Sequence, residues 1–245
     1  MEIFILAFFA LGYFLLAGAD IGVGMLLPYL GKTAAERRTV IAAIAPFFLG
    51  NEVWLVALAG VLAGLFPELE GELLTGNYLA LVALLVSWIV RDMGLWLRGR
   101  VQGARWQAGW DGAIVAGSWG LALAWGVIFT QILPVPIVAA LVVAPLFATH
   151  GLAFAGLRLT GELRERAVRL TGRSGEGRTY ALTAAALTGI VLLAGAYLEP
   201  AASAADAATL ALLVPAVLVL MPLLVVAQGF VWWTFRGRVT GPSYL

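Results

Sequence analysis

Residues 40–66 read VIAAIAPFFLGNEVWLVALAGVLAGLF, an apolar run with a single charged side chain, Glu52. About 20 apolar residues in helical form span the hydrocarbon core of a bilayer. A charged side chain near the bilayer centre costs about 2.5–3.5 kcal/mol on insertion scales. The run therefore predicts a transmembrane helix. It also raises the question of why Asn51 and Glu52 lie inside it.

The composition of the whole chain is that of a membrane protein. Of the 245 residues, 62% are hydrophobic and 12% are charged, whereas an ordinary soluble domain has about 25% charged residues. These residues include no cysteine and one histidine, His150, so disulfides, thiolate metal sites and iron–sulfur clusters within them are excluded. A net charge of +1 gives no reason to expect a nucleic-acid partner.

Seven segments are long and apolar enough to cross a membrane, which predicts an all-α polytopic membrane protein. Pro134 and Pro136 break the helix between the fourth and fifth segments. The first segment is too long for a signal-peptide core and has no basic residue before it, so we expect it to be retained. The predicted spans are residues 3–30, 40–66, 73–97, 110–133, 135–159, 180–198 and 208–235.

The charges orient these spans. All 15 Lys and Arg residues fall at one end of the predicted helices, which is the cytoplasmic end by the positive-inside rule. We therefore expect an external N-terminus and a cytoplasmic C-terminus. The loops at the opposite end carry acids alone, namely Glu2, Glu68, Glu70, Glu72, Glu199 and Asp206.

Asp20 and Glu52 are the acids that fall well inside predicted spans. They lie ten residues before residue 30 and twelve residues after residue 40, about 15 and 18 Å from the cytoplasmic end. Consecutive helices with a short connection are antiparallel neighbours, so we expect the two carboxyls to lie close together. Close carboxyls in a medium of low dielectric do not readily both carry charge, which suits a relay for cytoplasmic protons. Alternatively, each acid is neutral or paired and only fastens helices together.

Other polar residues near the cytoplasmic end could support such a site. Arg91 and Asp92, in the third span, could be interfacial anchors or partners of an internal acid, and for Arg91 we favour snorkelling to the interface. Asp111 falls in the predicted first turn of the fourth helix, where an acid suits the helix dipole. His150 could ligate haem, shuttle protons or hydrogen-bond another helix. Because one histidine cannot supply bis-histidine ligation, we favour the interhelical bond.

Four stretches, in order along the chain, form a recognisable pattern. They are GADIGVGMLLPYLGKTAAERRTVIAAIAPFFLGNEVWLV at 18–56, RWQAGWDGAIVAGS at 105–118, THGLAFAGLRLTGEL at 149–163 and FVWWTFRGRVT at 230–240. Together they resemble subunit II of the cytochrome bd-type quinol oxidases. The first stretch is similar to that family's N-terminal signature, including Asp20, the ERR loop and the GN-VWL pattern that contains Asn51 and Trp54.

The resemblance implies a role in respiration. In this family, subunit I carries the haems and the quinol oxidation site. Subunit II carries no haem, packs against subunit I, supports its haem assembly and contributes a proton route from the cytoplasm for reduction of dioxygen to water. It implies a bacterial or archaeal cell membrane and a haem-bearing subunit I as partner. Small single-helix subunits, lipids or a structural quinone are further candidate partners.

The resemblance also has departures. The family has nine helices, so we expect residues 1–133 to form a complete first bundle and residues 134–245 a reduced second one. Ala17 stands where the family has a second acid, and Phe47 and Leu49 replace a histidine and the aspartate of the proton route. Glu52 lies one turn after Leu49, about 4.5 Å along the helix, and we expect it to be a displaced relay carboxyl facing Asp20.

The candidate proton-path residues are thus Asp20, Glu52 and Asn51, with Arg91, His150, Asp111 and Trp54 as supporting residues. Two other functions stay open at this point. The chain could be an autonomous proton-coupled transporter, although it shows no internal repeat or discontinuous helix pair. It could also be a purely structural subunit without a proton path.

Overall fold

The computed structural model describes residues 1–134, 136–171 and 175–241 of the chain. Residue 135, at the start of the fifth predicted span, and Arg173, one of the 15 basic residues, lie outside these ranges. Seven helices in the described ranges are long and apolar enough to cross a membrane, which confirms the predicted number. The helices are α1 (Glu2–Met25), α2 (Leu27–Leu30), α3 (Ala34–Ile44), α4 (Phe48–Leu65), α5 (Pro67–Gly76), α6 (Tyr78–Leu97), α7 (Ala104–Ile132), α8 (Pro136–Arg158), α9 (Gly161–Thr171), α10 (Glu176–Leu198) and α11 (Ala207–Thr234).

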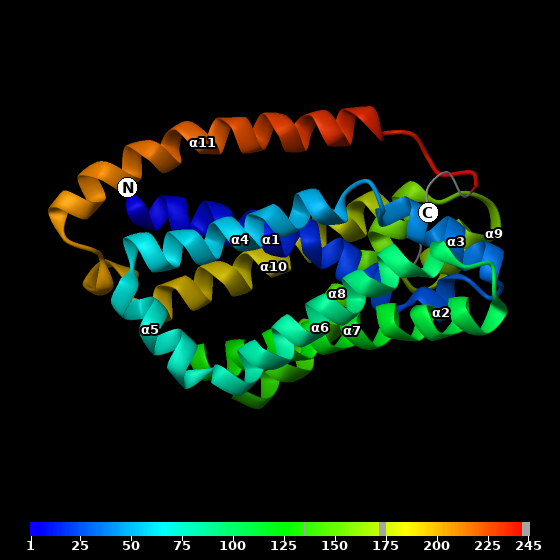
Figure 1. The fold of residues 1–245 in the computed structure, drawn as a ribbon, viewed down its shortest axis with the longest axis horizontal. Coiled ribbons are helices and arrows are strands. Elements are labelled where there is room, and N and C mark those ends of the chain that lie inside the picture. The colour runs from blue at the N-terminus through cyan, green and yellow to red at the C-terminus, as the bar shows by residue number, and fades with distance from the viewer. Residues whose placement is uncertain (135, 172–174, 242–245) are drawn as a thin grey trace.

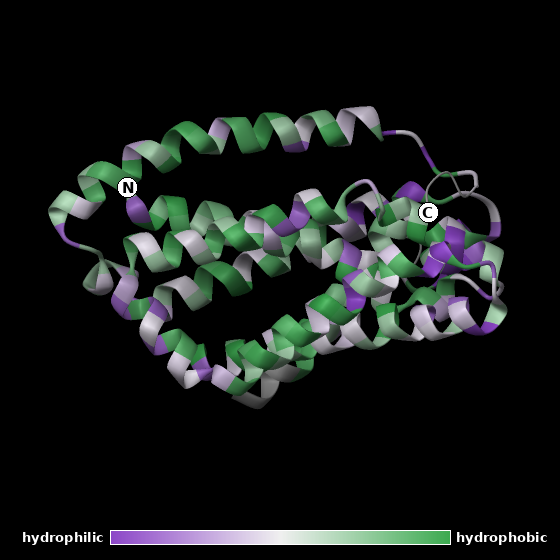
Figure 2. Cartoon of the chain, viewed as in Figure 1, coloured by the Kyte–Doolittle hydropathy of each residue, from purple (hydrophilic) through white to green (hydrophobic). Residues whose placement is uncertain are grey.

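The long helices run along a common direction and give the molecule two unlike ends (Figure 1). The short helices α2, α3 and α9 lie at one end, which we call the basic end, and hydrophilic residues are concentrated there (Figure 2). The N-terminus, α5 and the connection from α10 to α11 lie at the other, acidic end. This separation of charge is the one expected from the sequence, while its orientation in a membrane stays a prediction.

Prolines divide two of the predicted spans. The predicted helix 3–30 is α1 followed by the four-residue α2, which has Pro28 in its first turn. The predicted helix 40–66 is the end of α3 and then α4, with a turn between them that contains Pro46. Proline has no N–H to donate and clashes with the preceding turn of a helix. The membrane-spanning parts of these segments are therefore shorter at the basic end than predicted.

The third and fourth predicted spans also differ at their ends. Pro67 begins a separate short helix, α5, and the third spanning helix, α6, begins only at Tyr78. The fourth, α7, begins at Ala104 rather than residue 110. Asp111 consequently lies two turns inside α7. The prediction that Asp111 lies in the first turn and interacts with the helix dipole is therefore wrong.

The helices α1 and α8 touch backbone to backbone. A Cβ atom on Gly22 would lie 1.9 Å from the carbonyl oxygen of Phe147, and one on Gly151 would lie 2.3 Å from the carbonyl carbon of Gly22. Small residues allow this close approach between helices in lipid. The contact fixes α8 and its neighbour α10 against α1, the helix that carries Asp20.

A clamp of side chains holds the short helices of the basic end together. Thr33 and Glu36 form a capping box at the start of α3. Arg166 of α9 donates hydrogen bonds of 2.8 and 2.9 Å to the two carboxylate oxygens of Glu36, and a further bond of 2.9 Å to the carbonyl oxygen of Leu30. These bonds join α2, α3 and α9 into one layer over the ends of the spans.

The clamp predicts a dependence of stability on pH. The hydrogen bonds from Arg166 lower the pKa of Glu36 from its ordinary value of 4.5 to about 2. Because the pKa is lowered in the folded state, the contribution of Glu36 is complete above about pH 4.5 and is lost as the pH falls towards about 2. We expect Glu36→Gln to lower the unfolding temperature in detergent at about pH 6, and the difference from the wild type to shrink between about pH 4.5 and 2. The variant Glu165→Gln, at an exposed position of α9, is the control. A difference that does not depend on pH would contradict the prediction.

Candidate functional site

Asp20 and Glu52 lie at matching positions near the basic ends of their helices. Asp20 is five residues before the end of α1 and Glu52 is four residues after the start of α4, so each lies about 6–8 Å from its helix end. The expected similarity in depth is present, but the acids are less deep than the sequence suggested because α1 and α4 are shorter. Asp20 is 1% exposed and Glu52 is 9% exposed.

Arg91 of α6 lies between these two acids. Its Nη1 is 3.1 Å from Oε1 of Glu52 and 3.2 Å from Oδ1 of Asp92, and its Nη2 is 3.6 Å from Oδ2 of Asp20. Arg91 is only 2% exposed, and its guanidinium also lies over the ring of Phe48. The favoured snorkelling interpretation is therefore wrong, and Arg91 is a buried partner of acids on three helices. We call Arg91, Asp20, Glu52 and Asp92 the Arg91 cluster.

A chain of amide hydrogen bonds continues the Arg91 cluster to the last helix. Asn51 donates to both oxygens of Asp20, at 3.0 and 3.2 Å. Gln228 of α11 donates to Oδ1 of Asn51 at 2.8 Å and accepts from the indole N–H of Trp54 at 3.4 Å. Sequence reasoning had not singled out Gln228. A signal was available, because an amide inside an apolar helix is expected to hydrogen-bond to another helix.

Gln228 matters for the fold because it is one of the few buried residues of α11. Most side chains of this helix are exposed, and its buried residues are Met221 and Gln228. In Figure 1 it runs along one side of the other helices, and its main contacts are with α4 and α1. The amide chain thus ties the most exposed helix to the same cluster that joins α1, α4 and α6.

Leu49 and Glu52 do not share one environment, although the sequence places them only about one helical turn apart. Leu49 is 48% exposed in this chain, whereas the side chain of Glu52 points to Arg91. Glu52 is also not in direct contact with Asp20 in the described hydrogen bonds. The Arg91 guanidinium joins the two carboxyls.

Asp111 belongs to a second ion cluster, nearer the basic end. Its carboxylate accepts from Arg98 and from Arg37, the latter at 3.2 Å, and Arg98 also donates to the carbonyl oxygen of Ala34 at 3.0 Å. These bonds connect α7 to α3 and to the end of α6. Asp111 thus holds helices together through ion pairs with two arginines, and it does not interact with a helix terminus.

His150 connects three helices. Its Nδ1 lies 2.7 Å from the hydroxyl of Thr183 on α10, its Nε2 lies 3.0 Å from the carbonyl oxygen of Leu15 on α1, and its ring stacks on Tyr180. A carbonyl oxygen only accepts, so Nε2 carries the proton of this bond. Both ring nitrogens have protein partners, in agreement with the interhelical bond that the sequence favoured. Among the described residues, no group of three or more His, Cys, Asp or Glu could hold a metal ion.

The comparison with known proteins names the family. The family model for cytochrome bd terminal oxidase subunit II matches residues 1–201 of the 245. The chain belongs to this family. It is 33% identical over 179 residues to cytochrome bd ubiquinol oxidase subunit 2 of Bacillus subtilis. The matched region is 65% of this chain and 53% of that protein. It is 31% identical over 180 residues to cytochrome bd-I ubiquinol oxidase subunit 2 of Escherichia coli K12. Here the matched region is 64% of this chain and 48% of the relative.

A probable cytochrome oxidase subunit 2 of Haemophilus influenzae is 29% identical over 181 residues, covering 64% of this chain and 48% of that protein. The chain thus spans about half the length of the curated relatives it matches. With seven apolar helices in the part of the chain that the structure describes, it is a multi-pass membrane protein. The Arg91 cluster and Asn51 fall inside the part that matches the family, while Gln228 lies beyond it.

The Arg91 cluster predicts a large effect of removing its only described cation. With Arg91→Leu, Asp20, Glu52 and Asp92 would face one another without a guanidinium. Breaking one side of a buried ion pair costs about 3–5 kcal/mol, so we expect a marked fall in the unfolding temperature in detergent. Arg100→Leu, at an exposed position a few residues later, is the control and should change little. Equal effects of the two substitutions would restore the snorkelling interpretation.

Proposed function

We propose that this chain is a haem-free subunit of a bd-type quinol oxidase and that its Arg91 cluster passes protons from the basic end towards a haem-bearing partner subunit. Membership of the subunit II family supports the assignment to such an oxidase. In this proposal the basic end faces the cytoplasm, as the positive-inside rule requires, and the complex reduces dioxygen with electrons from quinol.

The observation that carries the proton role is the graded burial of three carboxyls around one guanidinium. The side chain of Asp92 is 20% exposed, that of Glu52 is 12% exposed and that of Asp20 is 1% exposed. All three lie within ion-pair distance of Arg91. Ionisable groups placed inside membrane helices mark ion and proton pathways. The series leads from the most accessible carboxyl to the most buried one.

The charges of the cluster suit the binding and release of a proton. One guanidinium offsets one carboxylate, so three ionised carboxyls would leave an excess of negative charge in a buried place, which is costly. A proton entering at Asp92 relieves this excess. Nη1 of Arg91 binds an oxygen of Asp92 and an oxygen of Glu52. A proton therefore has only a short distance to move from one carboxyl to the other. Asn51 holds the Asp20 carboxylate through two hydrogen bonds, 3.6 Å from Nη2 of Arg91, as the next proton acceptor.

The haems of such a complex would be bound by the partner. His150 is the only histidine of the sequence, and the sequence has no cysteine. Both nitrogens of His150 are already hydrogen-bonded, so binding of iron at either one would break an interhelical bond. This supports placing haem ligation, and with it quinol oxidation and oxygen chemistry, outside this chain.

Removing one carboxyl at a time tests the proton role. We expect Glu52→Gln and Asp20→Asn, in the assembled complex, each to slow quinol-driven oxygen consumption roughly tenfold or more, because a proton-transfer group is lost. The haem absorbance per mole of complex should stay unchanged. Glu165→Gln, at an exposed position of the same end, is the control. If the assembled variants consume oxygen at the wild-type rate, the cluster only fastens helices and the subunit is a scaffold.

The subunit assignment makes a separate prediction about partners. We expect the chain, solubilised gently from its native membrane, to co-purify with a larger haem-bearing membrane subunit. The chain purified alone should show no Soret absorbance. A native preparation without such a partner, or a Soret band from the isolated chain, would contradict the assignment. Mass spectrometry of the intact complex with an absorbance spectrum provides both measurements.

A further inference from the structure

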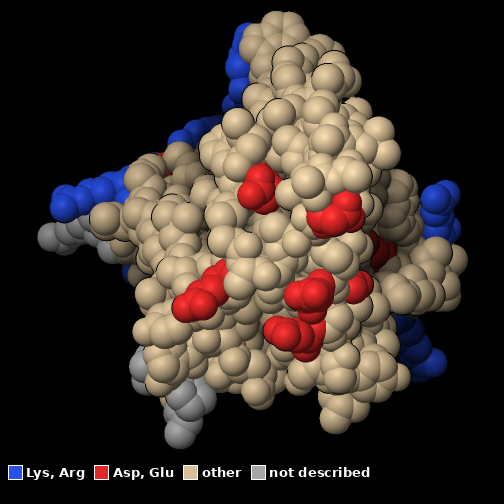
Figure 3. Space-filling model, turned by 90° about the vertical axis from the view of Figure 1, so that its left-hand side faces the viewer, with Lys and Arg blue, Asp and Glu red and all other residues tan. Residues whose placement is uncertain are grey.

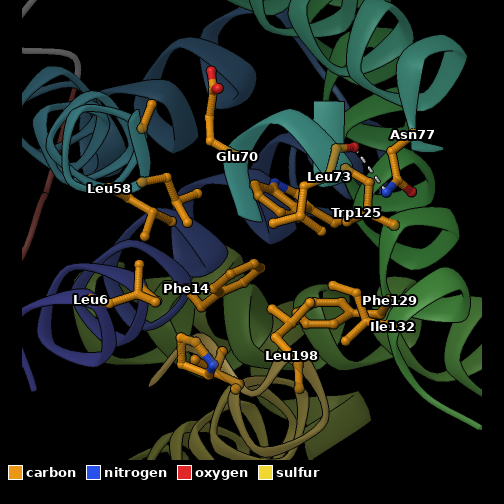
Figure 4. Close-up of a pocket in the computed structure, with 18 of the residues that line it drawn as sticks. Leu6, Phe14, Leu58, Glu70, Leu73, Asn77, Trp125, Phe129, Ile132 and Leu198 are labelled. Carbon is orange, nitrogen blue, oxygen red and sulfur yellow. Dashed lines mark hydrogen bonds between the residues drawn. The ribbon is translucent and has the colours of Figure 1, made fainter. Parts of the chain in front are cut away.

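The two ends of the molecule differ in their capacity to hold an anion. The acidic end has an apolar cavity of about 890 Å³, surrounded by side chains such as Phe14, Trp125 and Leu198 (Figure 4), and no lysine or arginine lines it. Figure 3 looks onto this end and shows acidic side chains spread over it, with Lys and Arg only at the outline. A negatively charged ligand is therefore expected at the basic end.

Arg158, the last residue of α8, is a buried cation at the basic end. The residue is 6% exposed, and its guanidinium forms no hydrogen bond or ion pair with the described residues. By contrast, Arg164 and Arg166 of α9 each pair with a glutamate. An arginine is almost never so deeply buried unless it is paired. Arg158 therefore lacks the negatively charged partner that its burial requires.

An aromatic ring supports the guanidinium of Arg158 on one side. The central carbon of the guanidinium lies 5.0 Å from the centroid of the Phe47 ring. That ring packs in turn against Phe154, Trp232 and Phe235. Of the three nitrogens, which are all unpaired, only Nε is fully enclosed, so Nη1 and Nη2 keep an accessible surface. The two nitrogens that form the open end of the fork can thus be reached by a ligand.

A second arginine brings positive charge to the same place. Nη1 of Arg238 donates to the carbonyl oxygens of Gly156 and Leu159, at 2.8 and 2.9 Å, on either side of Arg158 in the sequence. The next residue, Val239, donates from its backbone N–H to the carbonyl oxygen of Arg158 at 2.7 Å. The two guanidinium groups are close enough for their charges to repel each other. Two cations are thus held together where one already lacks a partner.

The acid that pairs with Arg238 does not balance these charges. Nη2 of Arg238 lies 3.3 Å from Oε1 of Glu176, and the same oxygen lies 2.6 Å from Nη2 of Arg164. Three arginines, including Arg158, therefore have one carboxylate between them. An excess of positive charge in a partly buried place is costly. A phosphate group offsets it well, because its several oxygens accept parallel N–H bonds from a guanidinium fork.

We propose that Arg158 and Arg238 bind one phosphate group at the basic end of the transmembrane helices. Nη1 and Nη2 of Arg158 donate to its oxygens, and Arg238 supplies the second positive charge. Arg158 ends a spanning helix, and basic pockets at that level bind the head groups of anionic lipids. An anionic phospholipid and a soluble phosphate compound both present such a group. The proposal does not rest on the proton role, because neither arginine belongs to the Arg91 cluster.

Binding of two phosphate sources to the purified protein tests the proposal. The full chain, with the subunits that purify with it, is stripped of lipid in phosphate-free buffer. Native mass spectrometry measures binding of phosphatidylglycerol and of diacylglycerol with the same acyl chains, and the unfolding temperature reports binding of inorganic phosphate. We expect Arg158→Met to weaken binding of phosphatidylglycerol roughly tenfold or more, because charge-assisted hydrogen bonds are lost, and to leave diacylglycerol unchanged. An equal loss for inorganic phosphate would identify a site that soluble phosphates also enter.

Further variants separate binding from folding. Arg100→Met removes an exposed arginine of the same end and should leave all binding unchanged. Arg158→Lys keeps the charge without the fork of donors, so it should weaken binding less than Arg158→Met. Because Arg158 has no counter-ion in the stripped protein, Arg158→Met should not lower the unfolding temperature there. Arg91→Leu, which breaks existing ion pairs, should lower it.

Three results would each overturn the proposal. The first is equal binding of phosphatidylglycerol and of inorganic phosphate by the wild type and Arg158→Met. The second is a fall in the unfolding temperature of stripped Arg158→Met as large as that of Arg91→Leu, since the arginine would then already be paired. The third is loss of a partner subunit from Arg158→Met without phosphate binding by the wild type, which would assign the arginine to a carboxylate of that subunit. Oxygen consumption is not part of the readout, so failure here does not affect the proposed function.

Discussion

The contact between the Arg91 guanidinium and the carboxylates of Asp20 and Glu52 is the constraint on which the arrangement of the first helices depends. It joins α1, α4 and α6 at one depth, inside apolar membrane-spanning helices. A charge in such a place persists only when it is paired and hydrogen-bonded. Each of these three residues makes the burial of the other two tolerable, so the helices that carry them must meet there.

The rest of the polar interior is arranged around this contact. Asn51 bonds to Asp20 and Gln228 bonds to Asn51, so the attachment of α11 depends on the same carboxylate. On the other side of α1, Gly22 and Gly151 allow the backbones of α1 and α8 to touch, and His150 adds hydrogen bonds to α1 and α10. Thus α1 is held by ion pairs on one side and by close backbone packing on the other.

The two ends of the molecule use polar residues differently. At the basic end, arginines such as Arg98 and Arg166 are satisfied by acids and carbonyl oxygens of the chain itself. At the acidic end, the Oδ1 of Asn77 is buried and accepts no hydrogen bond from the described residues. The first arrangement fastens short helices over the ends of the spans.

The class of fold, the number of spans and the separation of charge follow from the sequence alone, because hydrophobic length and the placement of Lys and Arg are local properties of the chain. It also identified Asp20, Asn51 and Glu52, since a polar residue in an apolar run is conspicuous without any structure. The ends of the first two spans at Pro28 and Pro46 were misjudged, because composition alone does not say whether an apolar helix continues past a proline. Three features could be seen only in the folded chain: Arg91 is buried between two acids, Gln228 completes the amide chain, and the Oδ1 of Asn77 accepts no hydrogen bond from the described residues. Each of these depends on which side chains of distant segments meet, and that is set by the packing of the helices against one another.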